Sequence, residues 1–302
     1  MKKMNERMTA SGLLFRGFVV LLGTILSGAA KAGGPAVSAL NGKASVQGGV
    51  FDGYSAGIAD VSVTIPLGRS FGAQADFASG LVHDRSLVGV AGQGFWRDPD
   101  RGLLGIFSSH LERVAPEQNT MIHANRIGGE AEYYRGQFTA SLAAGGQSGQ
   151  VKKGAFAAVT IAWYPNGNLR LRIGADIHPG PSHVVLGFEN QLGAGTLSAL
   201  SVFADVGISD GNGQEAGQKN GYAYTGLRYY FGPAQKSLIQ RHREDDPPAF
   251  AQSGGGSGGA ASGQTFNNFS SRPAPAAVSG AASPSPGPCS MIMSGRGSST
   301  GC

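Results

Sequence analysis

Residues 169–177 read LRLRIGADI, and their alternation of apolar and polar side chains decides the fold. Leucine and isoleucine take every second position, and arginine, glycine or aspartate stand between them. Residues 60–65, DVSVTI, repeat the pattern. Because successive side chains of a strand point to opposite faces, each stretch predicts a strand with one apolar and one polar face. The same alternation recurs from Lys43 to Phe231.

This alternation predicts about twelve strands. Most are 9 to 11 residues long, the length that a tilted strand needs to cross a bilayer. A soluble β-sandwich shows the same alternation, so other features must separate the two folds. The strands are expected near residues 43–51, 56–65, 71–80, 87–96, 103–112, 122–134, 137–146, 154–164, 169–177, 183–192, 197–207 and 221–231.

The scarcity of lysine favours a membrane barrel. Between residues 33 and 232 the only lysines are Lys43, Lys152, Lys153 and Lys219. Soluble β proteins use charged side chains, lysine above all, to protect their sheet edges and to keep their surface wet. A surface that faces lipid has no such need.

The connections between the strands also favour a barrel. Those after even-numbered strands are tight and rich in turn residues, as at 66–69, 98–102 and 135–136. Some connections after odd-numbered strands are longer, notably 113–120 and 208–220. Short periplasmic turns and longer outer loops are typical of outer-membrane barrels. The pattern places both ends of the barrel in the periplasm.

Aromatic residues gather near the short-turn ends of the strands. Amphipathic rings prefer the headgroup level of a bilayer, so this bunching predicts an interfacial girdle, which a soluble core would not explain. A weaker girdle is expected at the other end from Phe51, Tyr54, Phe107, Phe156 and Tyr222. The first girdle comprises Phe71, Phe95, Trp96, Tyr133, Tyr134, Phe138, Trp163, Tyr164, Tyr229, Tyr230 and Phe231.

The N-terminal segment predicts export. A basic stretch precedes the apolar run 17–26, GFVVLLGTIL, and small residues at Ala30 and Ala32 fit a signal peptidase site. Ten apolar residues are too few to span a bilayer as a helix, which argues against a membrane anchor. The predicted organisation is a signal peptide at 1–32, a short N-terminal segment at 33–42, the barrel at 43–231 and a disordered tail at 232–302.

The charge balance argues against a nucleic-acid partner. The formal net charge is +5, but the first 32 residues carry +4 of it, which leaves +1 for the other 270. A nucleic-acid interface needs a basic face on the mature protein, and this balance does not supply one.

The predicted tail is rich in Gly, Ser, Ala and Pro, as at 253–259, SGGGSGG. Such composition buries too little apolar surface to offset the entropy of ordering. The charged junction 241–246, RHREDD, is the segment through which the tail could bind a partner. The tail is therefore either a passive extension or a segment that reaches a periplasmic partner. Cys289 and Cys302 could pair with each other or link two chains.

The last predicted strand carries a family resemblance. Tyr224, Gly226, Tyr229 and Phe231, in the run YTGLRYYF, resemble the terminal-strand signal of porin-like Gram-negative outer-membrane β-barrel proteins. In that family the outer-membrane assembly machinery reads this signal. The resemblance implies a single antiparallel up-and-down transmembrane barrel, placed in the outer membrane and surrounded by its lipid.

The polar positions of the strands are expected to line the lumen. Arg170, Arg172 and Arg228 are expected to face Glu130, Glu132 and Glu189 across it and to set up a transverse field, or else to form ion pairs that merely fill the interior. The predicted lumen residues are Asp60, Asp76, Arg126, Glu130, Glu132, Arg170, Arg172, Asp176, Glu189, Asp205 and Arg228.

These features favour a small channel for passive diffusion of small hydrophilic solutes, without a cofactor. The alternatives are a sealed structural or anchoring barrel whose tail binds a partner and, less favoured, an outer-membrane hydrolase. Ser108, His110 and Glu112 lie on one predicted strand, but steps of about 7 Å are too long for direct hydrogen bonds. No nucleophile motif stands out, so we expect no enzymatic activity. Five histidines fall towards the outer end: His83, His110, His123, His178 and His183.

Overall fold

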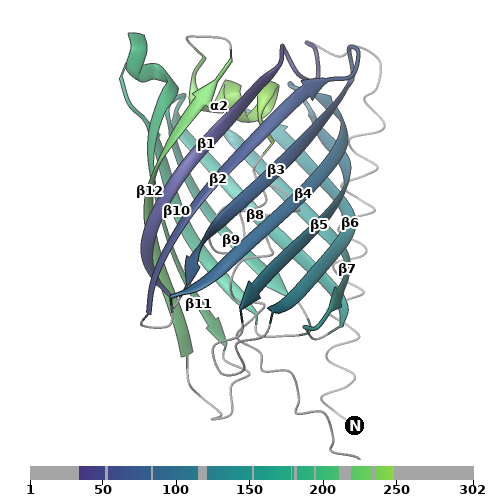
Figure 1. The fold of residues 1–302 in the computed structure, drawn as a ribbon. Helices are drawn as coiled ribbons and strands as arrows, with labels where there is room; N and C mark the ends of the chain where they lie inside the picture. Colours follow the sequence, from purple (N-terminus) through teal and green to yellow (C-terminus); the bar gives the residue numbers. More distant parts are fainter. Residues whose placement is uncertain are drawn as a thin grey trace, which may run out of the picture. The chain divides into compact units, whose positions relative to one another are not determined.

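Twelve antiparallel strands make up most of the described chain (Figure 1). The computed structural model describes residues 34–51, 54–82, 84–114, 121–151, 153–177, 179, 182–193, 195–210, 219–232 and 236–247. The strands are β1 (Asn41–Phe51), β2 (Tyr54–Pro66), β3 (Phe71–Val82), β4 (Arg85–Asp98), β5 (Gly102–Val114), β6 (Met121–Arg135), β7 (Phe138–Gly149), β8 (Gly154–Asn166), β9 (Leu169–Ile177), β10 (His183–Gln191), β11 (Leu200–Asp210) and β12 (Lys219–Phe231).

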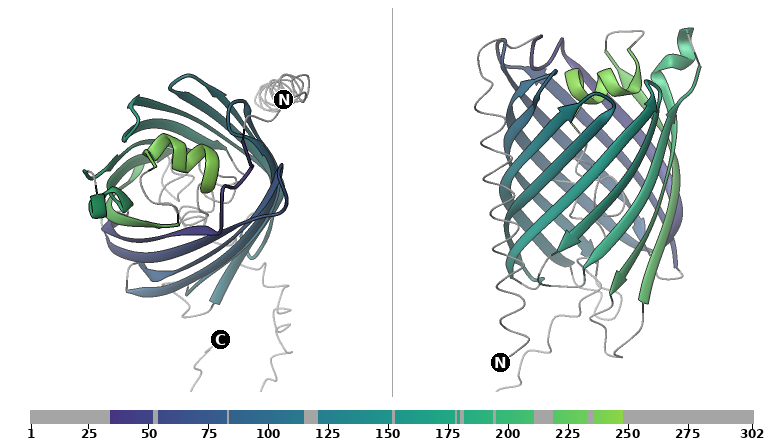
Figure 2. Two further views of the ribbon diagram at one scale, coloured as in Figure 1. Left: turned by 90° about the horizontal axis from the view of Figure 1, so that it is seen from above. Right: turned by 180° about the vertical axis from the view of Figure 1, so that it is seen from behind.

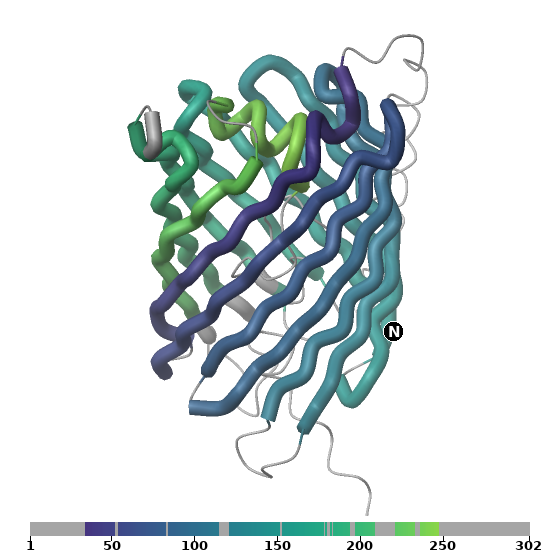
Figure 3. The backbone as a smooth tube through the Cα atoms, turned by 45° about the horizontal axis from the view of Figure 1, so that its top comes forward, coloured from purple at the N-terminus to yellow at the C-terminus, as the bar shows by residue number. Residues whose placement is uncertain are grey.

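The sheet closes on itself. Each strand pairs with its neighbours in sequence, and β1 pairs with both β2 and β12, so that Val46 lies opposite Ala59 on one side and Leu227 on the other. Closure leaves no strand edge with unpaired backbone groups, which a sheet in hydrocarbon requires. The continuous tilted wall is visible in Figure 3. The prediction of one antiparallel barrel of about twelve strands is confirmed.

Every predicted strand boundary lies within three residues of the observed one. The start of β11 shows the largest shift at the beginning of a strand, because the 3₁₀-helix η1 (Gly195–Ala199) occupies residues that the alternation assigned to the strand. A turn of 3₁₀-helix satisfies its own backbone locally and so delays the pairing with β10.

The barrel is apolar outside and polar inside. On β2, for example, Val61, Val63 and Ile65 are exposed, whereas Ser62 and Thr64 are buried. A soluble barrel has the opposite arrangement, because water then covers its outside. The observed inversion suits a barrel whose outer surface contacts hydrocarbon and whose polar groups satisfy one another within.

Inward-facing glycines explain part of the high glycine content. A Cβ at Gly207 would lie 2.1 Å from the ring of Tyr222, and one at Gly226 would lie 2.6 Å from the ring of Phe203. Each glycine lets a ring from a neighbouring strand lie flat against the wall. The large side chains of the interior are accommodated in this way.

A helical segment enters the barrel at the end where the short turns lie. It comprises α2 (Leu238–Gln240) and the single π-helical turn η2 (Arg241–Asp245), and it lies inside the ring of strands when viewed from above (Figure 2). The prediction that disorder begins at residue 232 is therefore wrong for residues 236–247, while residues 248–302 lie outside the described chain. Neither of these helical elements, nor any other in the described residues, is long and apolar enough to cross a membrane.

Candidate functional site

The structure places all eleven predicted lumen side chains in the barrel interior, none more than 6% exposed. Strand alternation positions them, as where Arg172 stands between the exposed side chains of Leu171 and Ile173. They are Asp60 on β2, Asp76 on β3, Arg126, Glu130 and Glu132 on β6, Arg170, Arg172 and Asp176 on β9, Glu189 on β10, Asp205 on β11 and Arg228 on β12.

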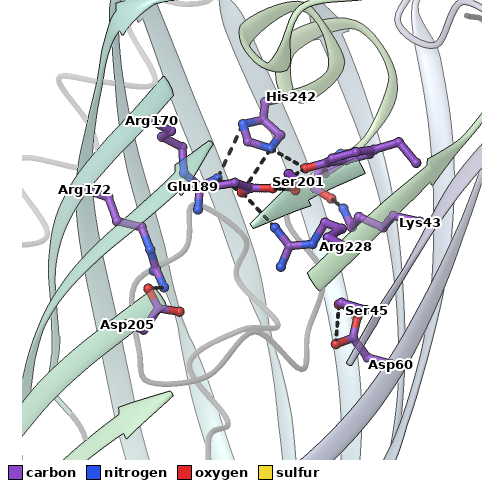
Figure 4. Close-up of polar contacts among 12 residues, drawn as sticks. Lys43, Ser45, Asp60, Arg170, Arg172, Glu189, Ser201, Asp205, Arg228 and His242 are labelled. Carbon is purple, nitrogen blue, oxygen red and sulfur yellow. Dashed lines mark hydrogen bonds and ion pairs between the residues drawn. The ribbon is translucent and has the colours of Figure 1, made fainter. Parts of the chain in front are cut away.

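Glu189 is the centre of the largest polar cluster (Figure 4). Its Oε2 lies 2.7 Å from Nη1 of Arg228 and 3.8 Å from Nη1 of Arg170. Its Oε1 accepts hydrogen bonds from the hydroxyls of Tyr230, at 2.7 Å, and Ser201, at 2.8 Å. A buried carboxylate needs this many partners to offset its loss of hydration.

Arg172 of β9 forms an ion pair with Asp205 of β11, two strands away. Its Nη2 lies 2.5 Å from Oδ1 of Asp205, although Gly187 of β10 lies between the two residues in the sheet. A Cβ at Gly187 would lie 2.1 Å from that carboxylate oxygen, so the glycine makes room for the pair. The short contact is a charge-assisted interaction of the stronger kind.

The sequence leaves two arrangements open for the lumen arginines and glutamates, a transverse field or ion pairs, and the structure shows ion pairs. Arg170 of β9 and Arg228 of β12 pair with Glu189 of β10, and these strands lie within one stretch of the wall, β9 to β12. Glu132 instead accepts hydrogen bonds from Tyr134, at 2.7 Å, and from Ser141. Charges at contact distance on one wall neutralise each other locally, because the attraction between opposite charges falls with distance.

Other interior charges also have partners within the barrel. Arg126 lies 3.6 Å from Asp176, donates to Gln147 at 2.9 Å and stacks over the ring of Phe156. Asp60 accepts a hydrogen bond of 2.7 Å from Ser45. The polar wall is thus built of small clusters, some of which reach past the adjacent strand, as where Arg126 of β6 meets Asp176 of β9.

Residues 236–247, which we call the plug, bind this wall through side chains from many strands. Arg243 donates to the carbonyls of Gly136, at 2.9 Å, and Phe138, at 2.7 Å, and stacks over the ring of Tyr134. The backbone N–H of Ile239 donates to the carbonyl of Gly167, which ties the plug to the turn between β8 and β9. Two short turns of the barrel therefore hold one side of the plug.

The opposite side of the plug meets β1 and β2. Asp246 is fully buried and accepts a hydrogen bond of 3.3 Å from Thr64, and Lys43 donates to the carbonyl of Pro247. Asp245 accepts a hydrogen bond from Ser38 and lies 2.8 Å from Nζ of Lys236. The plug thus spans the mouth from β7 to β1.

His242 is the plug side chain that joins the Glu189 cluster. Its Nδ1 lies 2.9 Å from the hydroxyl of Tyr164 and 3.4 Å from Nη1 of Arg170, and its Nε2 lies 3.1 Å from the hydroxyl of Tyr230. A guanidinium can only donate, so Nδ1 is the acceptor and Nε2 carries the proton. The pKa of His242 is lowered well below 6.5, first by burial and then by Arg170.

Sequence reasoning missed the plug as part of this site. The run RHREDD reads as a solvated linker, because five of its six side chains carry full charges and nothing apolar lies among them. The available signal was the preceding pair Leu238 and Ile239, of which Leu238 is fully buried. An apolar pair before a charged run indicates a segment that packs against the rest of the protein.

The predicted aromatic girdles are partly wrong. Phe95, Tyr134, Tyr164 and Tyr230 point into the lumen and are buried. Phe71, Phe138, Trp163, Tyr229 and Phe231 do lie exposed on the outside. At the other end Phe51, Phe107, Phe156 and Tyr222 are buried, and Tyr54 is exposed.

The residues of the terminal-strand signal divide between the two faces. Tyr224 is buried in the interior, whereas Tyr229 and Phe231 are exposed and their ring centroids lie 4.9 Å apart. Gly226 lies beneath Phe203. That the assembly machinery reads these residues stays a prediction.

Two of the histidines lie in a polar patch on the outside of the barrel. Nδ1 of His110 lies 2.6 Å from Asn125, its Nε2 lies 3.1 Å from Glu112, and the ring of His123 stacks against it. The expectation that His110 and Glu112 are too far apart for a hydrogen bond is therefore wrong, because long side chains on one face lean along the strand and close the gap. His83 and His178 lie outside the described residues, as do Cys289 and Cys302. Among the described residues no group of three or more His, Cys, Asp or Glu is placed to hold a metal ion.

Comparison with known proteins shows similarity at the level of fold. No family model and no curated protein sequence matches the chain. The solved structures that resemble it include KdgM porin (8% identity, TM-score 0.47, 62% of this chain and 98% of that one), NanC porin (8%, 0.41, 62% and 98%) and outer membrane phospholipase A from Escherichia coli (8%, 0.44, 69% and 96%). The chain has the architecture of an outer-membrane β-barrel.

Proposed function

We propose that the chain is a small outer-membrane channel for passive diffusion of small hydrophilic solutes, closed at one mouth by its own plug. The observation that carries the proposal is the polar attachment of the plug. His242, Arg243 and Asp246 hold it through hydrogen bonds to the wall. Water can replace such bonds when the plug leaves, and Leu238 is the one buried branched aliphatic side chain of the plug, whereas a permanent filling would be expected to bury more apolar surface.

The wall behind the plug suits small polar solutes. Its charges are neutralised in pairs such as Arg172 with Asp205, so it offers both signs at short intervals and no large field of one sign. A twelve-strand barrel is wider than the eight-strand case, whose interior side chains can fill. Such a lumen would pass small hydrophilic molecules and would slow apolar ones.

The plugged mouth would face the periplasm. The strands begin at Asn41 and end at Phe231 on the side of the short turns, and short turns are periplasmic in outer-membrane barrels. The tail after the plug would then belong to the periplasmic side. Surrounding lipid and the assembly machinery are the partners that this placement implies.

A sealed anchoring barrel is the second candidate. The cluster of Glu189 with Arg170 and Arg228 favours it, because such pairs also stiffen a wall. In that case the plug would be a permanent part of the interior, and the tail would bind a periplasmic partner.

We propose no enzymatic role. The imidazole of His110 has Asn125 on one nitrogen and Glu112 on the other, which leaves it no free nitrogen for a nucleophile. Lipid or peptide hydrolysis by the purified protein that is lost on His110→Ala would revive the hydrolase alternative.

Current across planar bilayers tests the channel. The full-length protein and its His242→Arg variant are compared at neutral pH. A permanent cation at this position would face Arg170, so the plug should leave and stepwise current should rise. Absence of current above background for both proteins would reject the channel and favour the sealed barrel.

A further inference from the structure

The plug contains a buried imidazole whose two nitrogens have different surroundings. Nδ1 faces the guanidinium of Arg170, and Nε2 faces Tyr230 and, at 3.8 Å, Oε2 of Glu189. A proton added to His242 must go to Nδ1, because Nε2 already carries one. The new N–H would then lie between the hydroxyl of Tyr164, at 2.9 Å, which can turn to accept it, and the guanidinium of Arg170, at 3.4 Å, which can only donate and repels the added charge.

The charges around the ring come from every element that packs on it. Arg170 of β9, Arg228 of β12 and Lys43 of β1 oppose a positive ring, whereas Glu189 of β10 favours it. The neutral neighbours are the hydroxyls of Tyr164 on β8 and Tyr230 on β12. The plug's own charges adjacent in sequence are Arg241, Arg243, Glu244, Asp245 and Asp246.

Glu189 compensates for the added charge only in part, because its carboxylate already has other partners. Arg228 lies 2.7 Å from its Oε2, and Tyr230 and Ser201 donate to its Oε1. An imidazolium would have to compete with these partners at the longer distance of 3.8 Å. Protonation therefore destabilises the docked plug more than the released one.

From this geometry we infer that His242 is an acid-sensitive latch, so that acidification on the periplasmic side releases the plug and opens the lumen. This inference rests on the proposed channel for its consequence, but release itself can be measured without any current. The switching element is the whole plug, which the wall holds through separate polar contacts.

The direction of the pH effect follows from proton binding. Above about pH 6.5 the imidazole is neutral in both docked and released plug, so docking is independent of its titration. Below that value only the released form gains a proton, because the docked pKa is lowered, and release is favoured. One such proton shifts the equilibrium by up to about 30-fold between about pH 7.5 and about pH 5.

Asp246 acts in the opposite direction. Burial raises the pKa of Asp246 above 3.8. As the pH falls, this carboxylate therefore takes up a proton in the docked plug before it does so in the released plug, and acid favours docking. The raised pKa therefore reduces the net change below the full value. Asp246→Asn should remove this opposition and bring the change closer to the full value.

Hydrogen exchange of the full-length protein in detergent tests the latch. The backbone N–H groups of Ile239, Arg241 and Asp246 donate to Gly167, Ser237 and Arg241 respectively, so they are protected while the plug is docked. After correction for intrinsic rates, exchange in residues 238–246 should rise severalfold, and by no more than about 30-fold, from about pH 7.5 to about pH 5. His242→Gln, which stays neutral, should abolish the rise, whereas His110→Gln, on the outside of the barrel, should keep it.

The outcomes separate this inference from the proposed channel. A pH-independent exchange rate in the wild type, or an equal rise in His242→Gln, overturns the latch whatever the current measurements show. Release by acid without any current at about pH 5 supports the latch and rejects the channel. Current from His242→Arg without release by acid in the wild type retains the channel and rejects the latch.

Discussion

The barrel wall and the plug are built by different forces within one chain. The wall is a closed ladder of backbone hydrogen bonds, and every strand has two partners. The plug has few backbone bonds to the wall and is held by side chains such as those of Arg243 and His242. A continuous ladder breaks only as a whole, whereas a set of separate polar contacts can be exchanged for water. One chain can therefore contain a rigid wall and a plug that is able to leave it.

The largest effect should come from breaking the wall's central cluster. Glu189→Gln removes the charge that compensates Arg170 and Arg228, and it should lower the free energy of unfolding by about 3–5 kcal/mol. Urea unfolding in lipid vesicles measures it. Glu112→Gln, whose exposed side chain pairs with His110 outside the barrel, is the control and should change stability by less than about 0.5 kcal/mol.

A charge on the outside of the wall should have the next largest effect. Ile173→Arg places a cation in the middle of β9 on the exposed face, and the unfolding free energy should fall by about 2–4 kcal/mol. The same change at Ile177, the last residue of β9, should cost about 0–1 kcal/mol. Equal costs at the two positions would mean that depth in a bilayer does not matter here, and that the outside is not covered by hydrocarbon.

Loosening the plug should leave the wall intact. Arg243→Ala removes two hydrogen bonds to carbonyls of the turn between β6 and β7, and a charged hydrogen bond contributes about 1.5–3 kcal/mol. Exchange in residues 238–246 should therefore rise at least about tenfold, with no change in urea unfolding of the barrel. Arg243→Lys should recover only part of the protection, because it lacks the planar fork. A matching loss of barrel stability would show that plug and wall form one cooperative unit.

The smallest expected effect concerns the outer girdle. Phe138 and Trp163 stack with ring centroids 6.3 Å apart on the exposed face near the short turns. Trp163→Leu should lower the unfolding free energy by about 0.5–1.5 kcal/mol and should not change exchange in the plug. Faster exchange in the plug would mean that the outer surface supports it through the wall.

The same comparison explains what the sequence could predict. The wall follows a local rule, since a strand between lipid and a polar lumen must alternate at every residue. That rule placed all twelve strands and assigned side chains such as Arg172 and Asp205 to the inside. The same rule predicts that adjacent rings such as Trp163 and Tyr164 face opposite sides of the wall, so only one of the two can belong to the aromatic girdle. Treating both as interfacial contradicted the alternation itself.

The plug follows no local rule. His242 meets Tyr164 and Arg170, which are 78 and 72 residues away in sequence. Pairing of interior charges is equally non-local in part, since Arg172 reaches past Gly187 to Asp205. Composition marks such residues as polar, but it does not reveal which partner neutralises which charge.

The central claim is that the plug closes a conducting lumen, and a reversible crosslink tests it most directly. Ser38 donates a hydrogen bond to Asp245, so S38C/D245C places two thiols within reach of a disulfide, in a background with Cys289 and Cys302 changed to Ser. We predict that the oxidised protein carries no current in a planar bilayer at about pH 5, and that adding a reductant to the same bilayer restores stepwise current. Equal current before and after reduction, or none in either state, would contradict the account.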